Sequence, residues 1–448
     1  MKMRKLICMG LILAMSLSVL NGCGSEPEKM EKTEEKEESS KSDGKINLEF
    51  WDMTWGPAEY ISTAEGLVQK FNDSQDEIEV TYQSIPWDNF YQTFTTAIAS
   101  ESAPDVSTGS GYQQHQFAVM DEILSLDSII EEWETEGKTD DLLEGSIEQF
   151  QWDGKQIGIP FNCDPRAIFY RKDVFEEKGI KIPETWEELV QAAIDATSED
   201  MYGFTTGGAD TLGYWAMANF IFGQGGRIFN ESKEPTFNCQ ENVKAIRDIQ
   251  TMVDNGVFPA GNASYTVEDA QKLFLQGKAA MIYAGADFGP IIENQTETEF
   301  IDDIGVLPMI SAENGECYAP GGMNAIMGYS QSEHPEECKT FIKWWSENSA
   351  DLWTDGHMGA FSVRKSILNI DYFQNDKYKK LLADEIMPYF ITTNQPIPHA
   401  FPEMASVEGE LLLRDAFQMA LSKSGSPEEI ADQINDKLAV IMQAASEE

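Results

Sequence analysis

Strand-like and helix-like patterns of hydrophobic residues alternate along the chain after its first forty-five residues. Apolar and polar side chains alternate over residues 46–51, which is typical of a half-buried strand. Apolar residues recur at helical spacing over residues 57–72, alternate again over 78–82, return to helical spacing over 89–100, and begin a third strand near 105. This β-α-β-α-β order predicts an α/β domain with a largely parallel sheet.

Later helices begin with sequence signals that have a physical mechanism. Thr185 to Glu188 and Ser426 to Glu429 each match a capping box, in which a hydroxyl accepts from the amide three residues on and a glutamate reaches back. A further amphipathic helix is predicted over 268–276, and a buried strand over 279–283. About 400 residues follow the N-terminal segments, which is enough for two packed domains.

The N-terminus has the features of a targeting segment. Three basic residues among the first five precede an apolar stretch from Leu6 to Leu20, which is too short for a comfortable transmembrane helix. Residues 1–22 are therefore predicted to be a signal peptide. The segment Leu20-Asn21-Gly22-Cys23 resembles the bacterial lipoprotein signal, which implies that Cys23 is lipidated. A plain signal peptide with an incidental cysteine is the alternative.

The stretch that follows Cys23 predicts a flexible tether. Residues 24–45 contain eight acidic residues, five lysines and no aromatic residue, so they cannot bury enough apolar surface to order themselves. A flexible chain of this length spans roughly 25 Å r.m.s.. We expect residues 23–45 to be a lipidated cysteine and an acidic tether that hold the protein at the extracellular face of a bacterial membrane, in a cell without an outer membrane.

Charge and composition exclude several classes of function. The formal net charge is −45, and it becomes −48 when residues 1–22, with three bases and no acids, are removed. Such a surface repels phosphate backbones, so nucleic acid is not an expected partner. The histidines and cysteines show no metal-ligand spacing and no Gly-x-Ser-x-Gly motif is present, so we expect no metal, cofactor or catalysis. Buried free thiols are expected, with a disulfide as the alternative, at Cys163, Cys239, Cys317 and Cys338.

Several blocks resemble the extracellular solute-binding proteins of ABC importers, in particular the family 1 sugar-binding group that includes maltose-binding protein. The strongest block is Gly158 to Phe175, GIPFNCDPRAIFYRKDVF, and others are Phe274 to Met281 and Ile304 to Pro308. Their order and spacing extend the resemblance from about Ile46 to Ala444. The chain departs from the group at Glu408, where maltose-binding protein stacks a tryptophan on its ligand.

This resemblance implies a two-lobed periplasmic-binding-protein-like fold with a hinge and an interlobe ligand cleft. The first lobe is expected over 46–160 with about 320–365, and the second over about 161–319 with about 366–448. The implied partners are a carbohydrate ligand and the membrane permease subunits of an ABC importer, and the protein is expected to be a monomer. In open α/β sheets ligands bind outside the carboxyl ends of the strands.

A sugar needs flat aromatic platforms beside groups that form paired hydrogen bonds. Aromatic residues that follow strands or occupy loops are therefore candidates: Trp51, Trp55, Trp87 and Tyr112. The resemblance adds residues at the two crossovers, an aromatic pair that aligns with a ligand-stacking position, and two residues that follow a strand. These residues are Asn162, Asp164, Arg166, Gly322 and Asn324, then Tyr214 and Trp215, and then Asp287 and Phe288. By contrast, Trp344 and Trp345 lie in a helical run and are expected in the core, and residues 131–134 are expected to form a solvated helix face.

Three alternatives stay open. Arg166 can hold Asp164, or it can grip the acid group of a charged solute such as an acidic saccharide. An extracellular carbohydrate-active enzyme would also use tryptophans and paired carboxylates, and an adhesin would bind without large closure. If Trp215 is a ligand platform, its replacement by alanine should weaken binding more than it lowers stability.

Overall fold

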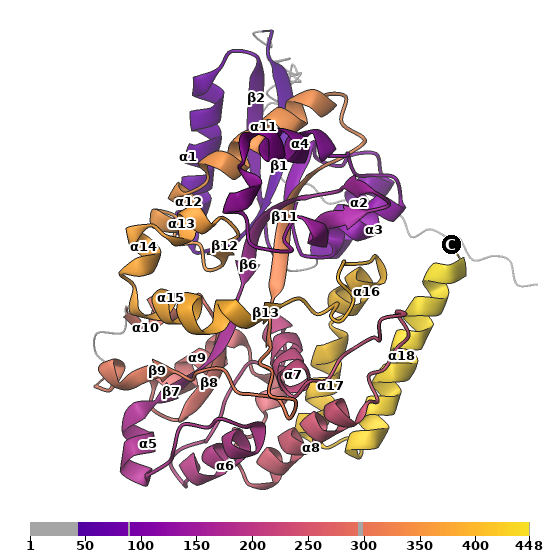
Figure 1. Cartoon of the computed structure of the whole chain (residues 1–448). Helices are drawn as coiled ribbons and strands as arrows, with labels where there is room; N and C mark the ends of the chain where they lie inside the picture. The colour runs from indigo at the N-terminus through magenta and orange to yellow at the C-terminus, as the bar shows by residue number, and fades with distance from the viewer. Residues whose placement is uncertain (1–43, 88–89, 294–298, 448) are drawn as a thin grey trace, which may run out of the picture. The chain divides into compact units, whose positions relative to one another are not determined.

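The computed structural model describes residues 44–87, 90–293 and 299–447 (Figure 1). The predicted signal peptide, Cys23 and all but the last two tether residues lie outside the described residues. Lys45 belongs to the folded part, because its ammonium forms an ion pair with Glu79 at 3.1 Å. No helix in the described part of the chain is long and apolar enough to cross a membrane.

A six-stranded sheet forms the centre of one lobe. Its strand order is β12-β6-β11-β3-β1-β2. The first three strands pair in parallel, as the sequence predicts, whereas β11 runs antiparallel to both β3 and β6. The prediction of a largely parallel sheet is therefore wrong for the half that is built from later segments. The strands are β1 (Ile46–Met53), β2 (Ile78–Ile85), β3 (Val106–Gly109), β6 (Ile159–Asp164), β11 (Gly322–Gly328) and β12 (Phe361–Ser362).

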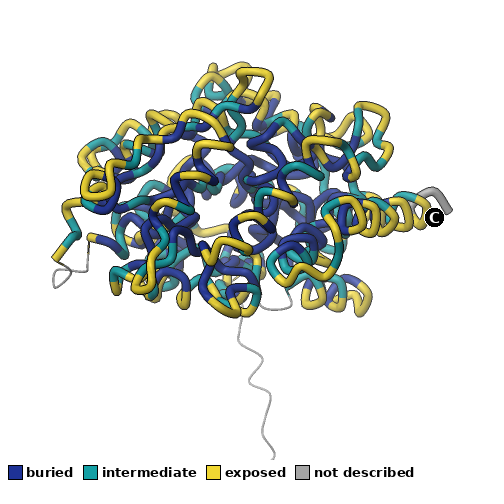
Figure 2. Tube along the Cα trace, turned by 90° about the horizontal axis from the view of Figure 1, so that it is seen from below, coloured by how far each residue is buried: buried dark blue, intermediate teal, exposed yellow. Residues whose placement is uncertain are grey.

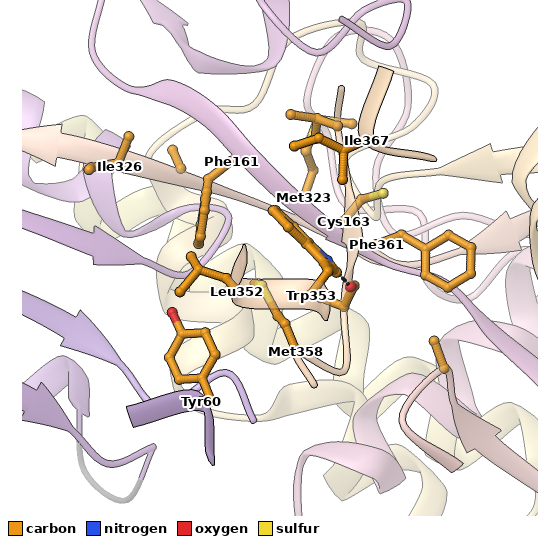
Figure 3. Packing of buried hydrophobic residues seen from close by; sticks show 14 of the residues in the cluster. Tyr60, Phe161, Cys163, Met323, Ile326, Leu352, Trp353, Met358, Phe361 and Ile367 are labelled. Carbon is orange, nitrogen blue, oxygen red and sulfur yellow. Dashed lines mark hydrogen bonds between the residues drawn. The ribbon is translucent and has the colours of Figure 1, made fainter. Parts of the chain in front are cut away.

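Helices from both ends of the sequence pack on this sheet. Figure 3 shows Trp353 beside Phe161 of β6, and its indole Nε1 donates to the carbonyl of Ala360 at 2.7 Å. This packing joins residues some 200 positions apart in one core. The helices of the lobe are α1 (Ala58–Ser74), α2 (Phe90–Ala99), α3 (Gln113–Val119), α4 (Asp127–Glu136), α11 (Pro335–Asn348), α12 (Asp351–Thr354) and α13 (Lys365–Leu368).

A three-stranded sheet, in the order β8-β7-β9, lies at the centre of the second lobe. The strands are β7 (Arg166–Arg171), β8 (Met281–Gly285) and β9 (Ile304–Val306), and both neighbours run antiparallel to β7. Helices from two stretches of sequence surround it: α5 (Lys172–Lys178), α6 (Trp186–Ala196), α7 (Thr211–Gly223), α8 (Gln240–Asp254), α9 (Val267–Leu275), α10 (Phe288–Glu293), α14 (Asp371–Gln374), α15 (Lys377–Leu381), α16 (Glu403–Gly409), α17 (Leu412–Ser422) and α18 (Pro427–Glu447).

The predicted capping signals start real helices. At α18 the capping box is complete, because Glu429 N donates to Ser426 Oγ at 3.2 Å and Ser426 N donates to the Glu429 carboxylate at 2.9 Å. At α6 the hydroxyl of Thr185 accepts as predicted, but the Glu188 carboxylate accepts from the amide of Glu184 instead. The buried strand predicted over 279–283 is β8, and it begins two residues later.

Two expectations about buried residues need correction. Trp345 is fully buried on α11 as predicted, but Trp133 is also fully buried, within the run that was expected to be solvated. The three glutamates around it are exposed, while Arg364 lies 4.6 Å above its ring. All four described cysteines are free, but Cys239 and Cys317 are only half-buried.

The chain passes between the two sheets at segments that lie close together. β6 leads into β7 through Pro165, and β10 (Ala319–Pro320) leads into β11 while pairing with β13 (Phe390–Ile391) (Figure 1). Figure 2 shows dark, buried backbone through the interior and exposed turns at the periphery. The connecting segments therefore bring residues of both lobes to one place. The predicted lobe boundaries stay predictions.

Candidate functional site

Asp164 and Arg166 form the centre of the site, at the passage from β6 to β7. The Arg166 guanidinium forms an ion pair with the Asp164 carboxylate and also donates to the Asp164 carbonyl at 3.1 Å. Its central carbon lies 4.3 Å from the ring centroid of Trp215 on α7, a cation–π contact. The guanidinium is thus already held by a carboxylate, a carbonyl and an aromatic face.

Asn162 and Asn324 lie beside this pair on the neighbouring strands β6 and β11. Asn162 shares a sheet face with Asp164, because side chains two residues apart in a strand point the same way. Asn324 Nδ2 donates to Asn162 Oδ1 at 2.7 Å. Gly322 completes the group, since a Cβ there would lie 3.5 Å from the Trp215 ring. Asn162, Gly322 and Asn324, which the family resemblance names as candidates, therefore lie beside the Asp164–Arg166 pair in the structure.

Asp287 adds a second carboxylate close by, after the end of β8. It is exposed, and a Cβ at Gly285 would come within 2.5 Å of its Oδ1 and 3.8 Å of Asp164 Oδ1. Although part of the Asp287 side chain is exposed, the atoms packed around its carboxyl group displace water and, with the nearby charge of Asp164, raise its pKa to about 6. Asp287 also approaches Gly359 of the first lobe, so both lobes meet here.

Two tryptophans of the first lobe lie near this group, because the amide of Gly359, which meets Asp287, also donates to the Trp55 carbonyl at 3.2 Å. The rings of Trp55 and Trp87 pack edge to face with centroids 4.9 Å apart, and Trp87 packs in the same way on Phe90 at 5.2 Å. Their indoles are fixed by hydrogen bonds, from Trp55 Nε1 to Thr108 Oγ1 at 3.1 Å and from Trp87 Nε1 to the Thr54 carbonyl at 2.8 Å. Trp87 is 38% exposed, so part of its ring is available to a ligand.

A buried carboxyl group supports Trp55 through Thr108. Asp52 is fully buried and accepts hydrogen bonds from the hydroxyls of Thr108 at 2.6 Å, Tyr60 at 2.8 Å and Tyr82 at 3.3 Å. Burial raises the pKa of Asp52 to about 7, although these hydroxyls oppose the shift. Because Thr108 also accepts from Trp55, the carboxyl group fixes the orientation of the indole through one hydroxyl.

Glu408 connects the two lobes directly. It lies on α16, and one carboxylate oxygen accepts from the Tyr91 hydroxyl at 2.9 Å and from Ser110 Oγ at 2.5 Å, both on the first lobe. Burial raises the pKa of Glu408, while the hydroxyls and the Arg166 charge lower it. Sequence reasoning missed Tyr91 and Ser110, although the departure from the family at Glu408 was the signal.

Tyr112 makes a second connection of this kind. Its hydroxyl bonds to Thr393 Oγ1 at 2.9 Å and donates to Asn394 Oδ1 at 3.1 Å. Tyr214 also lies near Thr393, with the two hydroxyl oxygens 3.4 Å apart. Both tyrosines are buried, at 3% and 1% exposure, so they support the site from beneath and present no free ring face.

Two predicted platforms lie elsewhere. Trp51 packs on Phe94 and donates to Glu49, away from the pair at Asp164. Phe288 is fully buried, with its ring against Phe169 and Phe274 at 5.2 and 5.9 Å, so it belongs to the core of the second lobe. Trp215 is in the site but only 6% exposed, and Arg166 covers one of its faces.

The arrangement combines aromatic rings, three carboxylates and amides between two lobes. Within the described ranges, no group of three or more His, Cys, Asp or Glu residues is arranged to hold a metal ion. Aromatic faces suit the C–H faces of a sugar, and carboxylates and amides suit its hydroxyls. The chemistry is that of recognition of a polar small molecule.

The fold and the site define a two-lobed solute-binding protein. The family model of the bacterial extracellular solute-binding proteins matches residues 56–351, and the chain belongs to this family. This confirms the family and the two-lobed α/β fold that the sequence predicts.

Relatives and solved structures agree with this family. A sugar transporter protein from Arthrobacter chlorophenolicus A6, solved with laminaribiose, is 28% identical with a TM-score of 0.80, covering 88% of this chain and 99% of that one. A binding protein of Brucella abortus (strain 2308) is 26% identical over 320 residues, which cover 70% of this chain and 75% of the relative. The arabinooligosaccharide-binding protein of Halalkalibacterium halodurans is 22% identical over 347 residues, 75% of each chain.

Proposed function

We propose that this protein is a carbohydrate receptor that binds a sugar or oligosaccharide between its lobes and delivers it to the permease of an ABC importer. The observation that carries the proposal is that residues of both lobes meet at Gly359, whose amide donates to the Trp55 carbonyl at 3.2 Å and where a Cβ would lie 2.9 Å from that of Asp287. The similarity to a structure solved with laminaribiose and to an arabinooligosaccharide-binding protein supports a saccharide ligand. The protein acts as a monomer and needs no cofactor.

The proposed location is the outer face of the cell membrane, through a lipid on Cys23. The apolar stretch before Cys23 and the acidic segment after it support this location. Two acyl chains hold a protein at a membrane, whereas a single one binds reversibly. Expression of the full chain and of Cys23→Ala tests the anchor: the first should fractionate with membranes and the second should be released.

Binding is tested by a thermal-shift screen of mono- and oligosaccharides, followed by calorimetry. A ligand at 100 times its Kd stabilises the folded state by about 2.7 kcal/mol. We expect at least one neutral or charged saccharide to give this shift and to close the lobes in small-angle scattering. A screen in which no saccharide binds contradicts the proposal, and binding without closure favours an adhesin.

The carboxylates also permit a hydrolase as the second candidate, since two facing carboxyl groups are what glycosidases use. We expect each bound saccharide to be recovered intact after prolonged incubation, because a receptor has no need to distort the glycosidic bond. Release of shorter sugars from a bound oligosaccharide, lost in Asp287→Asn, would assign the chain to the enzymes instead.

A further inference from the structure

The charges of the site are unequally matched. The positive charge of Arg166 lowers the pKa of Asp164, Asp287 and Glu408. Among the described residues, however, Arg166 forms an ion pair only with Asp164. Neither Asp287 nor Glu408 forms an ion pair with any described residue. If all four groups are ionised, the site carries three negative charges and one positive charge.

Arg166 is poorly placed to bind an acidic ligand. Its guanidinium already pairs with Asp164, donates to a carbonyl and lies on the Trp215 ring. An incoming carboxylate would have to compete with Asp164 and would approach the charges of Asp287 and Glu408. Like charges within a few ångströms repel one another, so these two carboxylates oppose the binding of an anionic group.

The two free carboxylates have oxygens to offer. Glu408 uses one oxygen, Oε2, for both Tyr91 and Ser110, while Oε1 accepts no hydrogen bond from the described residues. Asp287 is exposed at the end of β8 beside Asp164. A ligand that carries positive charge and N–H donors would suit such oxygens and offset the negative charge of the site.

Two buried polar atoms independently point to a ligand at the same place. Asn162 is fully buried, and its Nδ2 has no hydrogen-bond partner among the described residues. Tyr283 is 1% exposed, and within the same ranges its hydroxyl also has no partner. Asn162 shares a strand face with Asp164, and the charges acting on Tyr283 are those of Arg166 and Asp164. Buried polar atoms are normally paired, so these two suit the hydroxyl and ring oxygens of a sugar.

We propose that the cleft selects a saccharide with a basic nitrogen, whose cation is attracted by the unpaired carboxylates Asp287 and Glu408 while Asn162 and Tyr283 bind its oxygens. Arg166 then serves to neutralise Asp164 and does not bind an acidic ligand. This inference rests on the proposed function, because it presumes that the ligand is a saccharide.

Calorimetry with matched sugars tests the selection. In the gluco, galacto and manno series, the neutral sugar, the 2-amino sugar, its N-acetyl derivative and the uronic acid are compared as mono- and disaccharides. The N-acetyl form keeps the substituent but removes its charge. We expect the amino sugar of the bound series to have a Kd about tenfold or more below the neutral and N-acetyl forms, and the uronic acid not to bind.

Two variants locate the selection in the structure. Asp287→Asn and Glu408→Gln remove one charge each with little change of shape, and each should bring the Kd values of the amino and N-acetyl forms closer together. Glu410→Gln is the matched control, because Glu410 is an exposed residue at the end of the same helix. Thermal unfolding of each variant checks folding, and the ligand panel on the unaltered protein stands without them.

The possible outcomes separate the two proposals. Equal or tighter binding of a neutral, N-acetyl or uronic sugar overturns the selection and leaves the carbohydrate receptor in place. A preference that persists in both carboxylate variants overturns the assignment to Asp287 and Glu408. If no saccharide of any series binds, both proposals fall together.

Discussion

The tryptophans that the two lobes contribute to the site, Trp87 and Trp215, differ in how far they are exposed. On the first lobe, Trp87 is 38% exposed and its Nε1 donates to the Thr54 carbonyl, so part of the ring is available to a ligand. On the second lobe, Trp215 is 6% exposed and lies under the guanidinium of Arg166. The exposed part of Trp87 suits stacking with a ligand, whereas the Trp215 ring supports the guanidinium of Arg166. A tryptophan in a binding cleft is therefore not always a platform.

The largest expected effect comes from removing the buried ring of Trp215. Trp215→Ala should lower the free energy of unfolding by about 3–5 kcal/mol, because the ring is buried and its loss leaves a cavity beside Gly322. Thermal or denaturant unfolding measures this loss. The sequence alone predicts a larger effect on binding than on stability, and that order of effects would show that Trp215 is an open platform after all.

Asp52, which holds Thr108 and through it Trp55, should make the stability of the folded protein depend on pH. The pKa of Asp52 is raised from 3.8 to about 7 in the folded state, so the folded protein keeps a proton that the unfolded chain loses between these values. Stability from this group is therefore complete below pH 3.8 and is lost as the pH rises to about 7, at up to about 1.4 kcal/mol per pH unit.

Asp52→Asn removes this titration while keeping an acceptor for Thr108. We expect the variant to gain stability relative to the natural protein as the pH rises from about 4 to about 7, by about 3 kcal/mol in total. The difference between the two proteins isolates Asp52 from the other carboxyl groups with raised pKa values, such as Asp287. A difference that does not change with pH would mean that Asp52 is ionised throughout.

Removing the hydrogen bonds that Tyr91 and Ser110 donate to Glu408 across the lobes should have a smaller effect. Tyr91→Phe with Ser110→Ala removes both donors to Glu408, and a hydrogen bond to a charged group contributes about 1.5–3 kcal/mol. We expect the ligand-free protein to populate open lobes, with a larger radius of gyration in small-angle scattering. Tyr82→Phe, which removes a hydroxyl inside the first lobe only, should leave the scattering unchanged. Unchanged scattering in the double variant would contradict a bridging role for Glu408.

The sequence predicts single helices and strands well, because hydrophobic periodicity and helix caps depend on residues that are neighbours in the chain. Periodicity locates the first three strands and two helices within three residues, and the capping box at Ser426 starts α18 as predicted. The antiparallel partners of β6 escape this reasoning, since β11 and β12 lie more than 150 residues further along the chain. Pairing over that distance leaves no periodic trace in either segment.

The site shows the same division. Asp164, Asn162 and Asn324 follow from the sequence blocks that carry the family resemblance, and they lie together. Phe288 does not lie with them. An equivalent position in the family indicates where the backbone runs, but it does not indicate whether the side chain points to the site or to the core. Nor does any pattern reveal that Arg166 covers Trp215 or that Glu408 meets Tyr91, since each contact joins residues that are far apart in sequence.

The smallest expected effect comes from removing the partly exposed ring of Trp87. Trp87→Ala should weaken saccharide binding by about 1–2 kcal/mol, through loss of the ring area that a sugar covers, and should change stability by less, because the ring is already partly exposed. Trp51→Ala is the matched control, since Trp51 is half-buried on the same lobe but packs on Phe94 outside the cleft. Calorimetry on both variants decides: equal losses would mean that the effect comes from the lobe's stability, and loss in Trp87→Ala alone identifies the open ring as the surface on which the sugar stacks.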